Sequence, residues 1–209
     1  MRIIGGTAGG RILKVPDGLG VRPTPDLVRQ AIFNSLVDRP IEARVLELFG
    51  GTGALSLECL SRGSASALIV EKSAKHAEFI RRNAAVAGLA DRLHLRIQDA
   101  FTAMAQLAEQ GELFELVFAD PPYGDKNVGK RSTSFAQRML DDVNLPRLVA
   151  PGGLVLIGHT KRDTLEIPAH WDERKTMKHG DTMFRFLRPR PPSPPPDDTA
   201  GEVRETFAK

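Results

Sequence analysis

Cysteine occurs only once in the 209 residues of this chain, at Cys59. A single thiol cannot close an internal disulfide, and without a Cys-X-X-Cys pair or a histidine–cysteine cluster the chain has no ligand set for a structural zinc ion. The five histidines likewise show no metal or catalytic-triad spacing. We therefore expect the fold to depend on side-chain packing and the chemistry to need no metal.

Long hydrophobic runs are also missing. No apolar stretch approaches the ~20 residues that span a bilayer, and the chain becomes glycine-rich at Gly5-Gly6, before the apolar core of a signal peptide could form. We expect a cytoplasmic protein with no membrane partner. The composition, 41% hydrophobic and 26% charged, is that of a globular protein and excludes a wholly disordered, collagen-like or fibrous chain.

Acidic residues are absent from the start of the chain. The net charge is only +3, yet Arg2, Arg11 and Lys14 all precede the first acid, Asp17. A basic segment of this kind suits a polyanionic partner. A solvated basic face explains it equally well.

Short apolar runs alternate with amphipathic segments from Ala43 onward. The runs that we expect to be buried strands are residues 45–49, 67–70, 93–97, 116–119 and 154–157. This alternation predicts an α/β fold with a mostly parallel sheet and helices on both of its faces. Residues 171–187, interrupted by His179-Gly180-Asp181, predict an antiparallel hairpin at the sheet edge. The proline-rich residues 189–209 cannot bury enough apolar area to fold, so we expect a disordered tail.

Two elements are expected before this alternation. Apolar runs at residues 2–4 and 11–15, separated by glycines, predict a hairpin or loose ribbon. Thr24 directly precedes a proline suited to a first helical turn, so we expect a helix from Pro25 to Val37 with Thr24 as its capping residue.

A glycine-rich segment, residues 47–56, lies where the first expected strand ends and a helix starts, the position at which α/β sheets bind nucleotides. Ser56 stands where the dinucleotide fingerprint needs its third glycine, and no Gly-Lys-Ser/Thr of a phosphate-binding loop is present, so phosphate cradling is disfavoured. Glu47 would repel a pyrophosphate but suits a cationic ligand, and S-adenosylmethionine carries an ammonium and a sulfonium. A tight turn without a ligand is the structural alternative.

Carboxylates close the next two expected strands as well. Glu71 follows the glycine loop by about twenty residues, the spacing at which a carboxylate accepts hydrogen bonds from ribose hydroxyls. Asp99 ends the third strand and could accept from an adenine amino group; helix capping is the alternative for both acids. The expected cofactor-binding residues are Glu47, Phe49, Gly50, Gly51, Gly53, Glu71, Lys72, Asp99 and Ala100.

The most specific motif is Asp120-Pro121-Pro122-Tyr123, directly after the fourth expected strand. Consecutive prolines fix φ and remove two donors, a carboxylate only accepts hydrogen bonds, and tyrosine offers a flat face for stacking. Such a site suits a planar group that bears an NH2, so we expect all four residues to be catalytic. A rigid proline turn with a capping aspartate is the alternative.

These two motifs together resemble those of the amino-methyltransferases, which use S-adenosylmethionine to methylate the exocyclic amines of bases or a glutamine amide. Further segments resemble the RsmD family, the bacterial small-subunit ribosomal RNA guanine-N2 methyltransferases: Gly5-Gly6 with Gly10-Arg11, residues 22–36, and residues 48–55 with Glu58. The resemblance covers residues 1 to about 188. It implies a Rossmann-like class I methyltransferase fold, with a mostly parallel seven-stranded sheet and an N-terminal hairpin and helix extension.

The resemblance also implies a cofactor and a substrate. The cofactor is S-adenosylmethionine, and the target is the N2 amine of a guanine in 16S ribosomal RNA, within the small subunit or an assembly intermediate; we expect a monomer. The base must leave its stack to reach a pocket. Tyr123 would then stack on the guanine, while Asp120 and the Pro121 carbonyl would accept from the amine.

Three parts of the chain are expected: an RNA-binding extension over residues 1–40, a catalytic domain over 41–188 and the tail. Candidate phosphate contacts are Arg2, Arg11, Lys14, Arg22, Arg29, Lys126, Lys130 and Arg131. We expect deletion of residues 1–15 to weaken RNA binding and to spare cofactor binding, although the ribbon could instead be a plain edge hairpin.

Two other functions remain open. The shared motif permits methylation of DNA adenine or of a protein glutamine, although many such enzymes have Asn in place of Asp120 and a separate target-recognition domain. A non-catalytic RNA-binding protein on a degenerate methyltransferase fold is the second, and the intact Glu47, Asp120 and Tyr123 argue against it.

Overall fold

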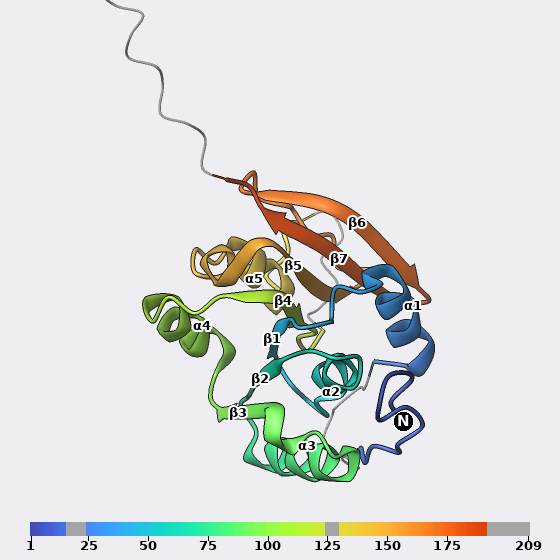
Figure 1. The fold of residues 1–209 in the computed structure, drawn as a ribbon. Helices are drawn as coiled ribbons and strands as arrows, with labels where there is room; N and C mark the ends of the chain where they lie inside the picture. The colour runs from blue at the N-terminus through green and yellow to red at the C-terminus, as the bar shows by residue number, and fades with distance from the viewer. Residues whose placement is uncertain (16–23, 124–129, 192–209) are drawn as a thin grey trace, which may run out of the picture.

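The computed structural model describes residues 1–15, 24–123 and 130–191, and a seven-stranded sheet in the order β3-β2-β1-β4-β5-β7-β6 lies at its centre (Figure 1). The strands are β1 (Arg44–Leu48), β2 (Ser66–Glu71), β3 (Leu93–Ile97), β4 (Phe114–Ala119), β5 (Val149–Thr160), β6 (Trp171–His179) and β7 (Thr182–Pro189). The first five are parallel to one another, and β7 is antiparallel to both β5 and β6. The expected fold class and the antiparallel edge hairpin are therefore confirmed.

Helices cover both faces of this sheet. They are α1 (Asp26–Leu36), α2 (Ala54–Ser61), α3 (Ala74–Ala87), α4 (Ala100–Glu109) and α5 (Phe135–Asp141), with 3-10 turns η1 (Ala90–Arg92) and η2 (Leu145–Leu148). Helices α1 to α3 pack on one face, and α4 and α5 on the other (Figure 1). Side chains alternate along a strand, so Leu116 and Phe118 of β4 belong to the first core while Val117 and Ala119 belong to the second.

Helix α3 is capped at both ends by residues suited to the task. The Ser73 hydroxyl accepts from the backbone N–H of His76, and Gly88 closes the helix with a φ of 70°. A left-handed C-terminal residue of this kind is most readily supplied by glycine.

The start of α1 differs from the prediction. Pro25 occupies the N-cap position and no side chain caps the helix, so the capping role expected of Thr24 is wrong. The Thr24 hydroxyl instead donates to Oδ2 of Asp120 at 2.7 Å. Sequence distance hides this pairing, because 96 residues separate the two partners.

The N-terminal ribbon is loose, as expected, with a single antiparallel bridge between Arg2 and Ile12. It is nevertheless part of the main core, because Ile3, Ala8 and Leu13 are buried among the residues of the α1–α3 face. Figure 1 shows the ribbon beside α2 and α3.

Two buried polar side chains hold the ribbon in place. The Glu58 carboxylate accepts from the backbone N–H groups of Ile4 and Gly5, at 2.7 and 2.9 Å. Asn83 accepts from the N–H of Lys14 and donates to the carbonyls of Lys14 and Thr52. Deleting residues 1–15 would expose core and leave Glu58 without these partners, so exposed side chains of the ribbon are the better targets for a binding test.

The sheet extends slightly beyond the expected catalytic domain. Pro189 belongs to β7, and the N–H of Arg190 donates to the carbonyl of His170 at 2.8 Å. The expected tail from residue 192 onward lies outside the described residues. Each helix in the described ranges is too short or too polar to span a bilayer.

Candidate active site

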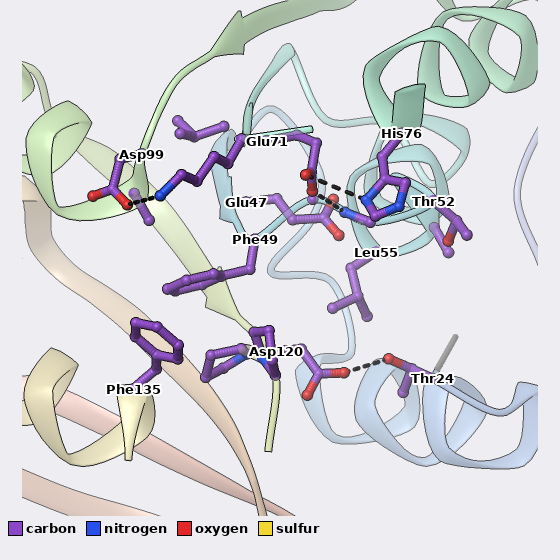
Figure 2. A pocket seen from close by; sticks show the side chains of 18 of the residues that line it. Thr24, Glu47, Phe49, Thr52, Leu55, Glu71, His76, Asp99, Asp120 and Phe135 are labelled. Atoms are coloured by element: carbon purple, nitrogen blue, oxygen red, sulfur yellow. Dashed lines mark hydrogen bonds and ion pairs between the residues drawn. The ribbon is translucent and has the colours of Figure 1, made fainter. Parts of the chain in front are cut away.

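A cavity of about 550 Å³ lies at the carboxyl ends of β1, β2, β3 and β4 (Figure 2). It is lined by all four residues of the Asp120–Tyr123 motif and by every expected cofactor residue except Gly53. The two motifs are thus walls of one site, because parallel strands bring their carboxyl ends to the same sheet edge. Lining residues that the sequence did not indicate include Thr24, Thr52, Leu55, His76, Gln98 and Phe135.

The glycine loop folds tightly against β2. A Cβ on Gly50 would clash with the side chain of Ile69, so only glycine fits there. Phe49, Gly51 and Gly53 all have positive φ, at 60°, 55° and 72°. The left-handed Phe49 is an unusual conformation for a bulky residue, and such residues cluster at functional sites.

Glu47 lies beneath this loop and is only 4% exposed. Its Oε2 accepts from the backbone N–H of Ser56 at 2.8 Å. Burial, reinforced by the charge of Asp120, raises the pKa of Glu47 to about 7. Because a buried carboxylate is unfavourable without a partner, a cationic group in the cavity would be strongly attracted here.

Glu71 ties the loop to the start of α3. It accepts from the N–H groups of Gly51 and Ser73 at 2.8 and 2.7 Å, and Oε1 lies 3.3 Å from Nδ1 of His76. An ionised carboxylate offers about four acceptor positions. Glu71 therefore retains capacity for ligand hydroxyls.

Asp99 caps α4, since its Oδ1 accepts from the N–H groups of Phe101 and Thr102. The capping alternative thus holds, although the residue also lines the cavity. Its Oδ2 lies 3.4 Å from Nζ of Lys72, whose side chain is 80% exposed, so this ion pair adds little stability.

The Asp120 carboxylate is held between two elements far apart in sequence. Oδ2 accepts from the Thr24 hydroxyl, and a Cβ on Gly158 of β5 would clash with Oδ1. Burial raises the pKa of Asp120 to about 6, against the lowering effect of the Thr24 hydrogen bond. Asp120 is therefore mostly ionised at neutral pH and acts as an acceptor.

Tyr123 stands at the mouth of the cavity. Its hydroxyl is hydrogen-bonded to the Thr182 hydroxyl of β7 at 3.1 Å, while the residue remains 38% exposed. One end of the side chain is thus fixed, and the residue is partly exposed beside the cavity.

An aromatic cluster forms a further side of the site. Phe49 and Phe135 have ring centroids 5.7 Å apart, and Phe101 lies within 6.3 Å of both. The guanidinium of Arg138 lies 4.4 Å from the centroid of the Phe101 ring. The sequence indicated only Phe49 of these three rings; Phe135, which also lines the cavity, belongs to no motif.

The expected phosphate contacts fall into distinct groups. Arg2, Arg11 and Lys14 are exposed on the ribbon, and Arg2 lies 3.8 Å from Asp26. Lys130 is exposed, and Arg131 pairs with Asp141 and Glu166, which offset its charge. The two candidates Arg22 and Lys126 lie outside the described residues.

The prediction that Arg29 contacts a phosphate is wrong, because Arg29 is fully buried. Its guanidinium donates to the carbonyls of Thr24 and Arg2 and to the carboxylate of Asp26. Burial lowers its pKa, opposed chiefly by Asp26. Arg29 therefore cannot reach a phosphate and has a structural role. Within the described ranges, no three His, Cys, Asp or Glu side chains are placed to hold a metal ion.

Two features define a class I S-adenosylmethionine-dependent methyltransferase. The first is the strand order with β7 reversed, and the second is the cavity that the glycine loop shares with the acids at the strand ends. Within that class, the chain belongs to the RsmD family, whose model is described as conserved hypothetical protein 95 and matches residues 1–188.

Individual relatives agree with this assignment. The chain is 40% identical over 195 residues to ribosomal RNA small subunit methyltransferase D of Escherichia coli, covering 90% of this chain and 89% of the relative. The solved structure of the putative methyltransferase yhhF from Escherichia coli is similar with a TM-score of 0.75 and 29% identity, over 90% of this chain and 97% of that one. An RNA methyltransferase from Salinibacter ruber, solved with S-adenosyl-L-homocysteine, has the same fold at a TM-score of 0.58 and 22% identity, over 85% and 98% of the two chains.

Proposed function

We propose that the protein transfers a methyl group from S-adenosylmethionine to the exocyclic N2 amine of a guanine in 16S ribosomal RNA. The observation that carries the proposal is the shared cavity, in which the Asp120–Tyr123 motif faces the glycine loop and its acids. The name of the Escherichia coli relative supports ribosomal RNA as the substrate.

The cavity fits this cofactor. Glu47 is a buried carboxylate that suits the cofactor's ammonium, and Glu71 has acceptor capacity for its ribose hydroxyls. The backbone of Gly50 and Gly51 lines the cavity between them, so a ligand can approach closely. Asp99, together with Lys72 and Ala100, bounds the end of the cavity assigned to the adenine.

On the opposite wall, the residues position the target amine. Tyr123 stacks on a guanine that has left its helical stack, and Asp120 accepts a hydrogen bond from the N2 amine through Oδ1. The Pro121 carbonyl supplies a second acceptor, since consecutive prolines place no N–H groups there.

Asp120 also stabilises charge that develops on the amine. S-adenosylmethionine held by Glu47 and Glu71 would supply an activated methyl group. The lone pair of the amine would form the new N–C bond as the C–S bond breaks and its electron pair stays on sulfur. Asp120 is ionised at neutral pH, so it favours the cationic amine at this stage and can take the proton that the nitrogen then releases.

RNA binding is assigned to the exposed basic side chains of the ribbon, Arg11 and Lys14, together with Arg2 and Lys130. We further propose that the enzyme acts as a monomer in the cytoplasm, on the small subunit or on an assembly intermediate.

The test is methylation of undermodified small subunits, and separately of naked 16S RNA, with labelled S-adenosylmethionine, followed by mapping of the modified nucleotide. A single N2-methylated guanine supports the proposal. Label on a ribosomal protein or on an adenine would replace it with one of the other amino-methyltransferase activities, and cofactor binding without any transfer would favour a non-catalytic role.

A further inference from the structure

We propose that Thr24 is a positioning residue for methyl transfer, which holds the Asp120 carboxylate toward the target amine and thereby makes the N-terminal segment part of the active site. This inference rests on the function proposed above. It concerns a residue that belongs to neither of the two motifs.

The contact itself is direct. The Thr24 hydroxyl donates to Oδ2 of Asp120 at 2.7 Å, and both residues line the cavity (Figure 2). Thr24 precedes α1 and makes no capping bond to that helix. Among the described residues, Thr24 is the one donor to the Asp120 carboxylate, and Oδ1 accepts no hydrogen bond. The hydroxyl therefore leaves Oδ1 as the oxygen for the substrate.

Within residues 1–15, 24–123 and 130–191, the remaining surroundings of Asp120 provide no substitute. Gly158 of β5 lies against its carboxylate, the ring of Phe184 of β7 lies close to Gly158, and neither residue carries a charge. In the described part of the chain, Glu47 of β1 is the charged side chain that interacts with Asp120, and this interaction is repulsive. Without the Thr24 hydroxyl, Asp120 would be a poorly solvated carboxylate next to another acid.

The backbone of Thr24 is in turn held by Arg29. Nη1 of the buried Arg29 donates to the Thr24 carbonyl at 3.1 Å, and Nη2 donates to the carbonyl of Arg2 and to Asp26. A guanidinium fork can hold several acceptors in one geometry. Arg29 thus ties the ribbon, the start of α1 and Thr24 into one unit that ends on the catalytic carboxylate.

This arrangement has a kinetic consequence. A hydrogen bond to the ionised form favours that form, so loss of the hydroxyl raises the pKa of Asp120 further. The carboxylate also becomes free to rotate. Both effects reduce the rate of transfer, and the first moves the acidic limb of the rate profile to higher pH.

The test compares Thr24→Val, which keeps the shape and removes the hydroxyl, with Thr24→Ser, which keeps the hydroxyl. Single-turnover methyl transfer is measured against pH, and S-adenosylmethionine affinity is measured by calorimetry. We expect Thr24→Val to lower the rate at neutral pH by roughly 10- to 100-fold and to raise the apparent pKa of the acidic limb by about one unit, with cofactor Kd within about twofold. Thr24→Ser should recover the wild-type limb and most of the rate.

Ser35→Ala is the matched control, because the Ser35 hydroxyl donates to the carbonyl of Ala31 within α1 and does not line the cavity. It should leave the rate and its pH dependence unchanged. If Thr24→Val matches the wild type, or if Thr24→Ser is equally impaired with no displacement of the limb, the positioning role is wrong.

A second measurement separates this inference from the proposed function. Carbon-13 NMR of the Asp120 carboxyl gives its pKa in the protein alone, with Asp120→Asn used for assignment. A higher pKa in Thr24→Val supports the contact even if the RNA target is another one, and an unchanged pKa overturns it. If the wild-type protein transfers no methyl group to guanine, the proposed function is contradicted but the Thr24–Asp120 contact is not. If Thr24→Val does not fold, Thr24→Ala serves for the same comparison.

Discussion

Glu47 and Asp120 are two acids of one cavity that differ in what holds them. Glu47 accepts from a backbone N–H of α2, whereas Asp120 accepts from the hydroxyl of Thr24. Burial raises the pKa of both, to about 7 and about 6. Because Glu47 lies under the glycine loop and Asp120 follows β4, we propose that Glu47 binds the cofactor and that Asp120 binds the target amine.

Asp120→Ala should reduce methyl transfer by roughly 100- to 1,000-fold, as expected when an electrostatic contact to a developing charge is lost. S-adenosylmethionine affinity should stay nearly unchanged. Single-turnover kinetics and calorimetry measure the two effects. Turnover close to wild type would remove Asp120 from the mechanism, and loss of cofactor binding would show that the division of roles between the two acids is incorrect.

Glu47→Gln should alter both stability and cofactor binding. Between pH 4.5 and 7, Glu47 is protonated in the folded state but ionised in the unfolded state, where its pKa has the ordinary value of 4.5. The contribution of Glu47 to the free energy of unfolding therefore falls as the pH rises from about 4.5 to 7. Gln keeps an acceptor for the N–H of Ser56 and removes this charge. We expect the variant to be more stable than the wild type at pH 8 by up to about 3 kcal/mol, measured by urea unfolding without cofactor.

The same substitution should weaken cofactor binding. A cationic ligand requires ionised Glu47, so wild-type affinity should fall up to about tenfold per pH unit below 7, and the variant should lack this dependence. A wild-type affinity that is flat between pH 5.5 and 8 would exclude Glu47 as the cofactor's counter-ion.

At the scale of elements, the site depends on how closely neighbouring strands approach. Gly50 allows the loop after β1 to lie on β2, and Gly158 allows β5 to lie beside the carboxylate that follows β4. Thr182 at the start of β7 fixes the Tyr123 hydroxyl. The antiparallel hairpin therefore supports a side chain that lines the cavity and also forms an edge of the sheet.

Gly158→Ala should impair transfer by displacing Asp120, because the added Cβ would clash with Oδ1 and touch the ring of Phe184. We expect a rate reduction of roughly tenfold or more, with cofactor affinity unchanged. A double-mutant cycle with Asp120→Ala tests the cause: the two rate effects should be strongly non-additive. Additive effects would mean that Gly158 acts elsewhere.

At the scale of the whole molecule, the N-terminal ribbon is both part of the core and a basic surface. Its apolar side chains Ile3, Ala8 and Leu13 are buried, while Arg11 and Lys14 are exposed. Glu58 and Asn83 anchor its backbone on α2 and α3. Core attachment and the proposed RNA binding can thus be tested separately by substitution but not by deletion.

Replacing Arg11 and Lys14 with alanine should weaken RNA binding and reduce the salt slope of log Kd by about one to two, because two phosphate contacts and their released counterions are lost. Cofactor affinity and thermal stability should not change. Arg147→Ala is the control, since Arg147 lies on η2, on the α4 side of the sheet. An unchanged salt slope in the double variant would move RNA recognition to the region of Lys130.

The sequence by itself determined the alternation of strands and helices, the glycine loop and the acids at strand ends. These features are local. The periodicity of apolar side chains indicates whether a segment is a helix or a strand, and a residue that directly follows a parallel strand lies at the carboxyl edge of the sheet. Glu47, Glu71 and Asp120 therefore reach one cavity without further information.

Only the tertiary structure decided the contacts between residues distant in sequence. Which faces of the elements pack together is not encoded in any local periodicity of the sequence. This packing decides the hydrogen bonds of Thr24 to Asp120 and of Thr182 to Tyr123, and the burial of Arg29. A threonine before a proline looks like a helix cap and an arginine in a basic segment looks like a phosphate ligand. The packed fold gives both residues other partners, because a partly buried hydroxyl and a buried guanidinium bond to whichever polar groups the fold brings near them.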